Sequence, residues 1–284
     1  MNRTKISAEA KQWILSRILA GAGSDQVISE LMAAGWQRKA ANDALIVVMA
    51  ENAKARVAVA ANDTPAEGMP EPRMEDSPLA LDAGDRQVKV LLEMKSPRVV
   101  VFGGLLSEEE CDQLVALAAP RMARSETVDR QTGKYQVDTA RTSQGMFFQR
   151  GESELHLRIE QRIATLLNWP VENGEGLQVL HYRPGAEYEP HYDYFDLADP
   201  GTPVLTRRGG QRVATLIVYL NTPQNGGATT FPDVGLSVSP QKGNAVFFSY
   251  PRPDPATKTL HAGAPVVAGE KWIATKWLRQ RVFA

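Results

Sequence analysis

The first part of the chain alternates apolar and polar positions at the spacing of amphipathic helices. In ISAEAKQWILSRILAG, apolar side chains at Trp13, Ile14 and Ile18 recur near helical spacing. Glycines follow this segment and the next one, SDQVISELMAAGW, and an alanine-rich third segment comes after them. The pattern predicts three short helices that form a small N-terminal helical domain over residues 1–58.

The string L…AGW…AA.DAL within these helices is similar to ubiquitin-associated-type three-helix modules. Two roles stay open for such a domain. The favoured role is a helical appendage or dimerisation element. The other is a module that binds a protein partner.

The composition changes between residues 59 and 87. The stretch ANDTPAEGMPEPRMEDSPLALDAGDR holds four prolines and many acidic residues. Such a segment buries little apolar surface, so we predict a linker over residues 59–87.

A longer domain is predicted over residues 88–284. VKVLLEM and PRVVVFGGLL have the pattern of strands, and SEEECDQLVALAAPRM begins with a capping box, Ser107 with Glu110. ESELHLRIEQRIATLLNW has an apolar stripe at helical spacing. Many short strands with turn residues between them follow Trp169, which indicates an antiparallel sandwich or barrel. We expect the upstream helices to pack on its outside, giving an α+β fold.

Composition and charge narrow the possible functions. Hydrophobic residues at 43% and charged residues at 23% are typical of a soluble globular protein. A formal net charge of −1 provides no global basic field for nucleic acid or an anionic membrane. Cys111 is the only cysteine, which excludes an internal disulfide and a thiolate metal cluster. The chain shows no signal-peptide core and no apolar run near the ~20 residues of a membrane helix, so we expect a cytoplasmic setting.

The stretch EPHYDYF places His191 and Asp193 two positions apart in a predicted strand. Residues i and i+2 of a strand face the same side, so an imidazole and a carboxylate become neighbours. A third metal ligand must come from elsewhere, and the candidates are His156, His181 and His261. Two histidines with one carboxylate form the ligand set of non-haem iron oxygenases, and His191, Asp193 and a distal His261 fit it.

A lysine, Lys271, follows His261 in the stretch HAGAPVVAGEK. A turn around AGE would bring Lys271 back beside the strand that carries His261. A buried ammonium needs an anion, and a metal-chelating keto acid with a distal carboxylate would supply one.

Several strings, in order, resemble the catalytic domain of the prolyl 4-hydroxylases, a family of 2-oxoglutarate- and Fe(II)-dependent dioxygenases. They are EYEPHYDYF, GGQRVATLIVYLN, GGATTFP, KGNAVFF and HAGAPVVAGEKWIATKWL, preceded by FGGLLSEEECDQLVALA and ARTSQGMFF. The resemblance covers roughly residues 97–282. It implies a double-stranded β-helix, or jelly-roll, core flanked by helices.

The resemblance also implies roles for individual residues. The iron ligands are His191, Asp193 and His261. The C5 carboxylate of 2-oxoglutarate is bound by Lys271, which counts with the iron ligands among the catalytic residues, and by Thr229, and Tyr182 also reaches this co-substrate. The peptide substrate is contacted by Tyr188, Arg212 and Trp277. Arg279 stands where some relatives carry histidine, which bears on the peptide preference.

The function implied is hydroxylation of a peptidyl proline at C4, with Fe(II), O2 and 2-oxoglutarate, ascorbate as reductant, and release of succinate and CO2. Two alternatives stay open. The same chemistry could act on a lysyl side chain, a free amino acid or a small molecule. The protein could instead be a scaffold or binding protein that acts through its N-terminal helical module.

Overall fold

The computed structural model divides into two compact units, Met1–Thr64 and Pro65–Ala284. The structure describes residues 6–19, 22–48, 68–124, 126–128, 135–137 and 142–284. No helix within these ranges is both long and apolar enough to cross a membrane.

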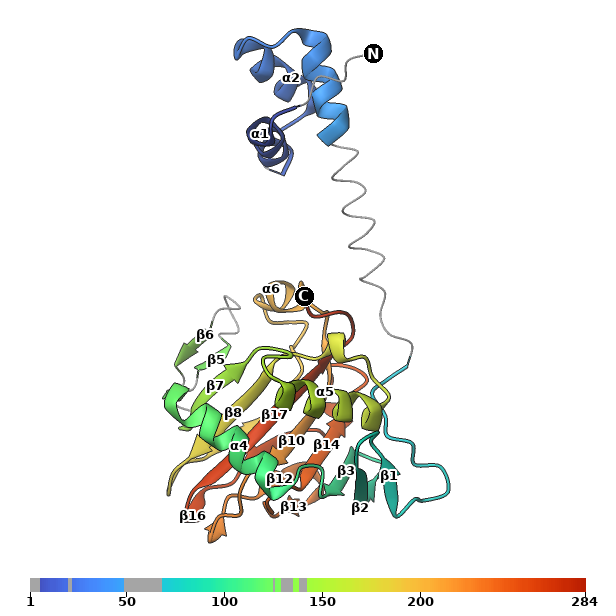
Figure 1. Ribbon diagram of the computed structural model, residues 1–284, viewed down its shortest axis with the longest axis vertical. Coiled ribbons are helices and arrows are strands. Elements are labelled where there is room, and N and C mark those ends of the chain that lie inside the picture. The colour runs from blue at the N-terminus through green and yellow to red at the C-terminus, as the bar shows by residue number, and fades with distance from the viewer. Residues whose placement is uncertain (1–5, 20–21, 49–67, 125, 129–134, 138–141) are drawn as a thin grey trace. The chain divides into compact units, whose positions relative to one another are not determined.

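The N-terminal unit is helical in its described part (Figure 1). Helix α1 spans Ala8–Leu19, α2 spans Ser24–Ala33, and residues 38–48 form a further helix. The three helices bury a small apolar cluster of their own, which comprises Ile14, Val27, Leu31, Ala41, Ala44, Leu45 and Val48. Amphipathic periodicity predicts these elements, and each helix contributes an apolar face to the cluster.

A large antiparallel sheet forms the frame of the second unit, with the strand order β1-β2-β3-β14-β10-β17-β8-β7-β4 (Figure 1). Its strands are β1 (Ala80–Asp82), β2 (Gln87–Met94), β3 (Arg98–Gly103), β14 (Ala245–Ser249), β10 (Arg212–Tyr219), β17 (Lys271–Arg279), β8 (Leu177–Tyr182), β7 (Gln144–Phe148) and β4 (Ala123–Arg124).

A second antiparallel sheet has the order β13-β12-β15-β9. Its strands are β13 (Leu236–Val238), β12 (Thr229–Phe231), β15 (His261–Gly263) and β9 (Tyr188–His191). Two further pairs are β11 (Asn225–Gly226) with β16 (Val266–Ala268) and β5 (Glu126–Val128) with β6 (Tyr135–Val137). An apolar cluster joins Leu180, Ile217 and Ile273 of the large sheet to Phe231 and Val238 of the small one. Two antiparallel sheets joined by a shared core fit the predicted jelly roll.

Helices α4 (Glu108–Ala118) and α5 (Glu154–Leu167) cover one face of the large sheet (Figure 1). The predicted capping box is present at the start of α4. The buried Arg162 of α5 ties the two helices together, because its guanidinium pairs with both Glu110 and Asp85. The shorter helical segments are α6 (Thr202–Thr206), η1 (Ala119–Arg121), η2 (Val171–Asn173), η3 (Pro232–Val234) and η4 (Pro255–Thr257).

Strand β17 shows how side-chain alternation places a site inside this fold. Lys271, Thr275 and Trp277 point to the side of the sheet that lines a pocket. Lys276, on the alternate side, reaches Glu160 of α5 and pairs with it in the interior. Because neighbouring residues of a strand face opposite sides, one strand serves both the helical layer and the pocket.

The structure corrects the predicted linker at residues 59–87. Residues 59–67 lie outside the described part of the chain, but Ala80–Asp82 form β1 and pair with β2. Ala83 is fully buried in the main core and Met69 packs against that core. The acidic and proline-rich composition concealed these few apolar anchors, so the linker prediction was wrong for residues 69–87.

Candidate active site

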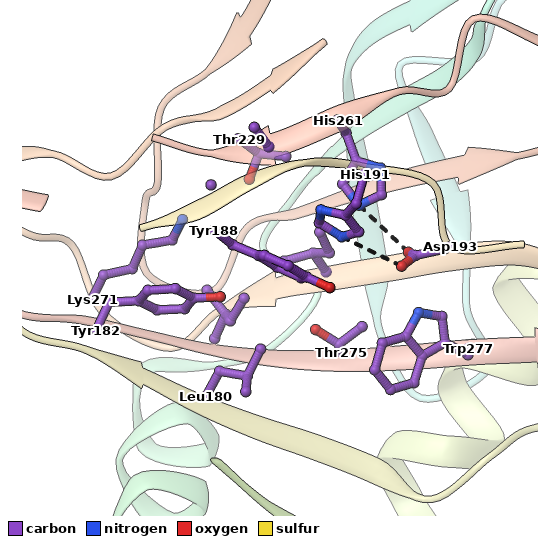
Figure 2. Close-up of a pocket in the computed structure, with 14 residues that line it drawn as sticks. Leu180, Tyr182, Tyr188, His191, Asp193, Thr229, His261, Lys271, Thr275 and Trp277 are labelled. Carbon is purple, nitrogen blue, oxygen red and sulfur yellow. Dashed lines mark ion pairs between the residues drawn. The ribbon is translucent and has the colours of Figure 1, made fainter. Parts of the chain in front are cut away.

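A pocket lies between the two sheets and is lined by all of the predicted site residues except Arg212 (Figure 2). Figure 2 shows the two imidazoles and the Asp193 carboxylate at one end and the Lys271 ammonium beside Tyr182 at the other, with Tyr188 between them. The pocket therefore has a candidate metal end and a cationic end.

The metal end brings together His191 of β9, His261 of β15 and Asp193. Strands β9 and β15 are paired in register with His191 opposite His261. His191 Nε2 lies 3.6 Å from Asp193 Oδ1, and His261 Nε2 lies 3.5 Å from Oδ2. Among the described residues this is the one group of three whose ligand atoms lie close enough to share a metal ion, all within 4.8 Å.

Asp193 reaches this group by a route that differs from the predicted one. Strand β9 ends at His191, so Asp193 lies in the bend that follows and not in a strand. Its side chain is positioned by tertiary contacts, since Thr215 Oγ1 donates to Oδ2 at 2.7 Å and Arg212 donates to its backbone carbonyl at 3.4 Å. The two residues meet as expected, but alternation along one strand is not the reason.

The protonation states of the group suit metal binding. The Nδ1 atoms of His191 and His261 bond to the carbonyls of Glu189 and Thr259 at 2.8 and 3.0 Å, so each Nδ1 carries the proton and each Nε2 presents its lone pair. Burial, and then the neighbouring His191, lower the pKa of His261 to about 4. Burial would raise the pKa of Asp193, but His261 and His191 hold it well below its usual value. A neutral imidazole at His261 and an ionised carboxylate at Asp193 are ligand forms that a divalent ion needs.

The cationic end is formed by Lys271, which is 2% exposed. Its ammonium lies 5.3 Å from the ring centroid of Tyr182 and 6.0 Å from that of Tyr219. No carboxylate in the described part of the chain pairs with it, and burial lowers the pKa of Lys271 to about 8. A buried ammonium in such a setting can bind an anion that enters the pocket.

Thr229, the second predicted anion contact, lines the same pocket. Tyr219 OH donates to its hydroxyl at 2.8 Å, which leaves the Thr229 proton available to a bound ligand. Tyr219 was missed by the sequence analysis. Its position inside an apolar strand, RVATLIVYL, looks like that of any core residue, so only the fold reveals this contact.

The predicted substrate residues lie around the metal end. Tyr188 stacks on the imidazole of His191 with ring centroids 3.6 Å apart. Trp277 lines the pocket, and its buried indole nitrogen has no hydrogen-bond partner among the residues that the structure describes. Arg212 lies with its guanidinium 3.8 Å above the Trp277 ring.

A buried carboxylate, Glu175, binds this arginine. The sequence patterns did not predict it. Arg212 donates to Glu175 through Nε and a terminal nitrogen at 2.8 and 3.1 Å. Arg279 donates to the same carboxylate at 2.6 Å and to the carbonyl of Gly210 at 2.6 Å. Burial alone would raise the pKa of Glu175, but the two guanidinium groups lower it. Arg279 therefore helps to hold the carboxylate that binds Arg212.

Comparisons with known proteins agree with this arrangement. Residues 177–279 match the model of the 2OG-Fe(II) oxygenase superfamily, and this region contains every residue of the pocket described above. The class of protein is therefore that of the Fe(II)- and 2-oxoglutarate-dependent dioxygenases, which take Fe(II), 2-oxoglutarate and O2.

Individual relatives identify the family to which the chain belongs within this class. The chain is 43% identical over 221 residues to prolyl 4-hydroxylase 5 of Arabidopsis thaliana, covering 70% of this chain and 74% of the relative. It is 42% identical over 216 residues to a probable prolyl 4-hydroxylase 3 of the same plant, covering 69% and 73%. A viral collagen prolyl hydroxylase from Paramecium Bursaria Chlorella virus-1, solved in complex with 2OG, is 34% identical with a TM-score of 0.49 over 64% of this chain and 95% of the other. The chain belongs to the prolyl 4-hydroxylase family.

Proposed function

We propose that this protein hydroxylates a peptidyl proline at C4, with His191, Asp193 and His261 holding the iron and Lys271 anchoring 2-oxoglutarate. One observation carries the proposal: three groups close enough to share a metal ion line the same pocket as a buried ammonium that has no counter-ion among the described residues. A structural metal site would need no second, cationic end.

The donor set supports an iron ion whose coordination sphere stays partly open. His191, Asp193 and His261 would hold the ion through three protein ligands, a set that is typical of oxygenases whose iron also binds a co-substrate and O2. When bound, iron and 2-oxoglutarate supply the oxidising chemistry: one oxygen atom of O2 enters a C–H bond of the substrate and the other leaves in succinate, with release of CO2. Ascorbate, typical of the family, serves as reductant.

The two-ended pocket supports 2-oxoglutarate as the co-substrate. The same three ligands would hold the metal at which the keto end of the diacid binds, and Lys271 would hold its distal carboxylate. Thr229 can donate its hydroxyl proton to the same carboxylate, and Tyr182 covers the ammonium with its ring. These residues bind and orient the diacid and keep water from its charged end.

The substrate residues fit a prolyl peptide. The amide preceding a proline has no N–H, so a prolyl residue offers its recognition site only carbonyl acceptors. The indole N–H of Trp277 is a donor without a partner in the described part of the chain, and Figure 2 shows it on the side of the ring toward Asp193. Tyr188, stacked on His191, adds an apolar wall beside the metal. Direct contact of Arg212 with the peptide stays a prediction, because Glu175 already binds its guanidinium.

A peptide assay tests the proposed function. The protein is incubated with Fe(II), 2-oxoglutarate and ascorbate together with a proline-rich peptide, with the same peptide carrying alanine for proline, or with a lysine-containing peptide. We expect succinate release and a gain of one oxygen atom with the proline peptide alone, and 4-hydroxyproline after hydrolysis. Oxidation of the lysine peptide at an equal rate would replace the substrate assignment, and absence of succinate with every substrate would favour a scaffold role.

The same assay tests the role of the Trp277 N–H. Trp277→Phe keeps an aromatic ring under Arg212 and removes the donor, so KM for the peptide should rise by about 5- to 10-fold, the equivalent of one lost hydrogen bond of ~1–1.5 kcal/mol. KM for 2-oxoglutarate should not change, because Lys271 lies at the far end of the pocket. An unchanged peptide KM would remove Trp277 from the substrate site.

We further propose that the N-terminal helical module binds a protein partner and does not take part in catalysis. Its own apolar core and the exposed Ile46 and Met32 support this role. Removal of residues 1–64 should therefore leave hydroxylation of a short peptide unchanged, and a loss of peptide turnover would contradict the proposal. The ubiquitin-associated likeness and the cytoplasmic setting stay predictions.

A further inference from the structure

Two buried hydroxyl groups form a line of hydrogen bonds that ends at the carboxylate of Asp193. Thr215 lies in the middle of β10, and Tyr250 directly follows β14. Thr215 Oγ1 lies 2.7 Å from Asp193 Oδ2 and 2.9 Å from the Tyr250 hydroxyl. Thr215 is 0% exposed and Tyr250 is 1% exposed, so no solvent reaches this line.

The direction of the two hydrogen bonds follows from the number of protons. An ionised carboxylate only accepts hydrogen bonds, so Thr215 must donate its single hydroxyl proton to Asp193. The Tyr250 hydroxyl must then donate to Thr215 Oγ1. Burial, followed by the nearby Asp193 charge, raises the pKa of Tyr250 well above its usual value, so the phenol keeps the proton that it donates.

The two hydrogen bonds bear on the orientation of the Asp193 carboxylate, which strand pairing does not fix. Asp193 lies beyond the end of β9, where no strand pairing holds it, whereas His191 and His261 are fixed by paired strands and by carbonyl bonds at Nδ1. The hydrogen bond at Oδ2 restrains rotation of the carboxylate and keeps Oδ1 on the side of His191. Outer partners of this kind commonly orient metal-binding carboxylates.

We propose that Thr215 and Tyr250 are positioning residues that hold the Asp193 carboxylate in its metal-binding orientation. Tyr250 acts through Thr215, by fixing the direction in which the threonine hydroxyl points. This inference rests on the proposed role of Asp193 as a metal ligand.

Two substitutions at one position separate the hydroxyl from the shape of the side chain. Thr215→Val keeps the volume and removes the hydroxyl, and Thr215→Ser keeps the hydroxyl and removes a methyl group. Calorimetric titration of the full chain with Mn²⁺ should show binding weakened by about 10- to 100-fold in Thr215→Val and by far less in Thr215→Ser. Thermal unfolding of each metal-free variant reports whether the fold is retained. In peptide assays, kcat should fall in Thr215→Val while KM for 2-oxoglutarate stays close to that of the wild type.

Tyr250→Phe provides a second variant that does not depend on the folding of Thr215→Val. It should weaken Mn²⁺ binding by a smaller factor. The double variant Thr215→Val/Tyr250→Phe should bind Mn²⁺ as Thr215→Val does, because Tyr250 has no hydroxyl to orient once Thr215 is gone. Additive losses would overturn the series arrangement of the two residues.

Other outcomes count against the proposal as a whole. Folded Thr215→Val that binds Mn²⁺ within twofold of the wild type, or Thr215→Ser as impaired as Thr215→Val, would show that the hydroxyl has no positioning role. A wild-type titration identical to that of His261→Ala would instead show that the metal site is wrongly placed, which is a failure of the proposed function and not of this inference alone.

Discussion

Replacement of His261 by alanine should abolish hydroxylation. His261 is one of three groups that can ligate the metal, and it lies 3.5 Å from Asp193 on the strand paired with that of His191. Loss of an outer partner of a metal ligand commonly costs ~10- to 100-fold, so loss of a ligand itself should cost more than ~100-fold in kcat/KM. Succinate release measures turnover and Mn²⁺ titration measures metal binding. Turnover and metal affinity should both fall in this variant.

His181→Ala is the matched control. His181 is also a buried histidine of the catalytic unit, but it pairs with Glu270 and stacks on Trp272, away from the pocket lining. Its replacement should leave metal binding intact. Normal turnover by His261→Ala, or equal losses in the two variants, would remove His261 from the metal site.

Replacement of Lys271 by methionine should have two opposite effects. Binding of 2-oxoglutarate should weaken by ~100-fold or more, because loss of one partner of a buried charge pair costs ~3–5 kcal/mol. The protein without 2-oxoglutarate should be no less stable, since its buried ammonium has no counter-ion among the described residues and its removal ends a desolvation cost. Calorimetry of the Mn²⁺-loaded protein and thermal unfolding measure the two quantities.

The pH dependence of binding gives an independent check on Lys271. Burial lowers the pKa of its ammonium to about 8. In the wild-type protein without 2-oxoglutarate, Lys271 is therefore charged below pH 8 and increasingly neutral above it. The dissociation constant of 2-oxoglutarate should therefore rise about tenfold for each pH unit above ~8. Lys271→Arg keeps its charge throughout this range and should lack that rise. A flat wild-type profile, or unchanged affinity in Lys271→Met, would mean that another residue anchors the diacid.

Local patterns predicted secondary-structure elements well where the capping residues and the apolar periodicity lie within one segment. The capping box at Ser107 and Glu110 marks the start of α4, and the apolar stripe of residues 154–167 specifies the face that α5 buries. The pair of His191 and Asp193 indicated a metal ligand set, since few residue types bind iron and the chain has only four histidines. Composition misled at residues 69–87, where a few apolar side chains outweigh an acidic background.

The sequence by itself determined the helices, the antiparallel strands and the residue types of the site, because periodicity, capping and ligand chemistry act over a few neighbouring positions. The jelly-roll class followed only from the family resemblance. Tertiary structure alone decided which partners surround them. Asp193 accepts a hydrogen bond from Thr215, Arg212 is held by Glu175, and Lys271 meets no carboxylate among the described residues. Such contacts join residues that are distant along the chain, and no local pattern records which buried polar group will meet which, since that depends on how the strands pair.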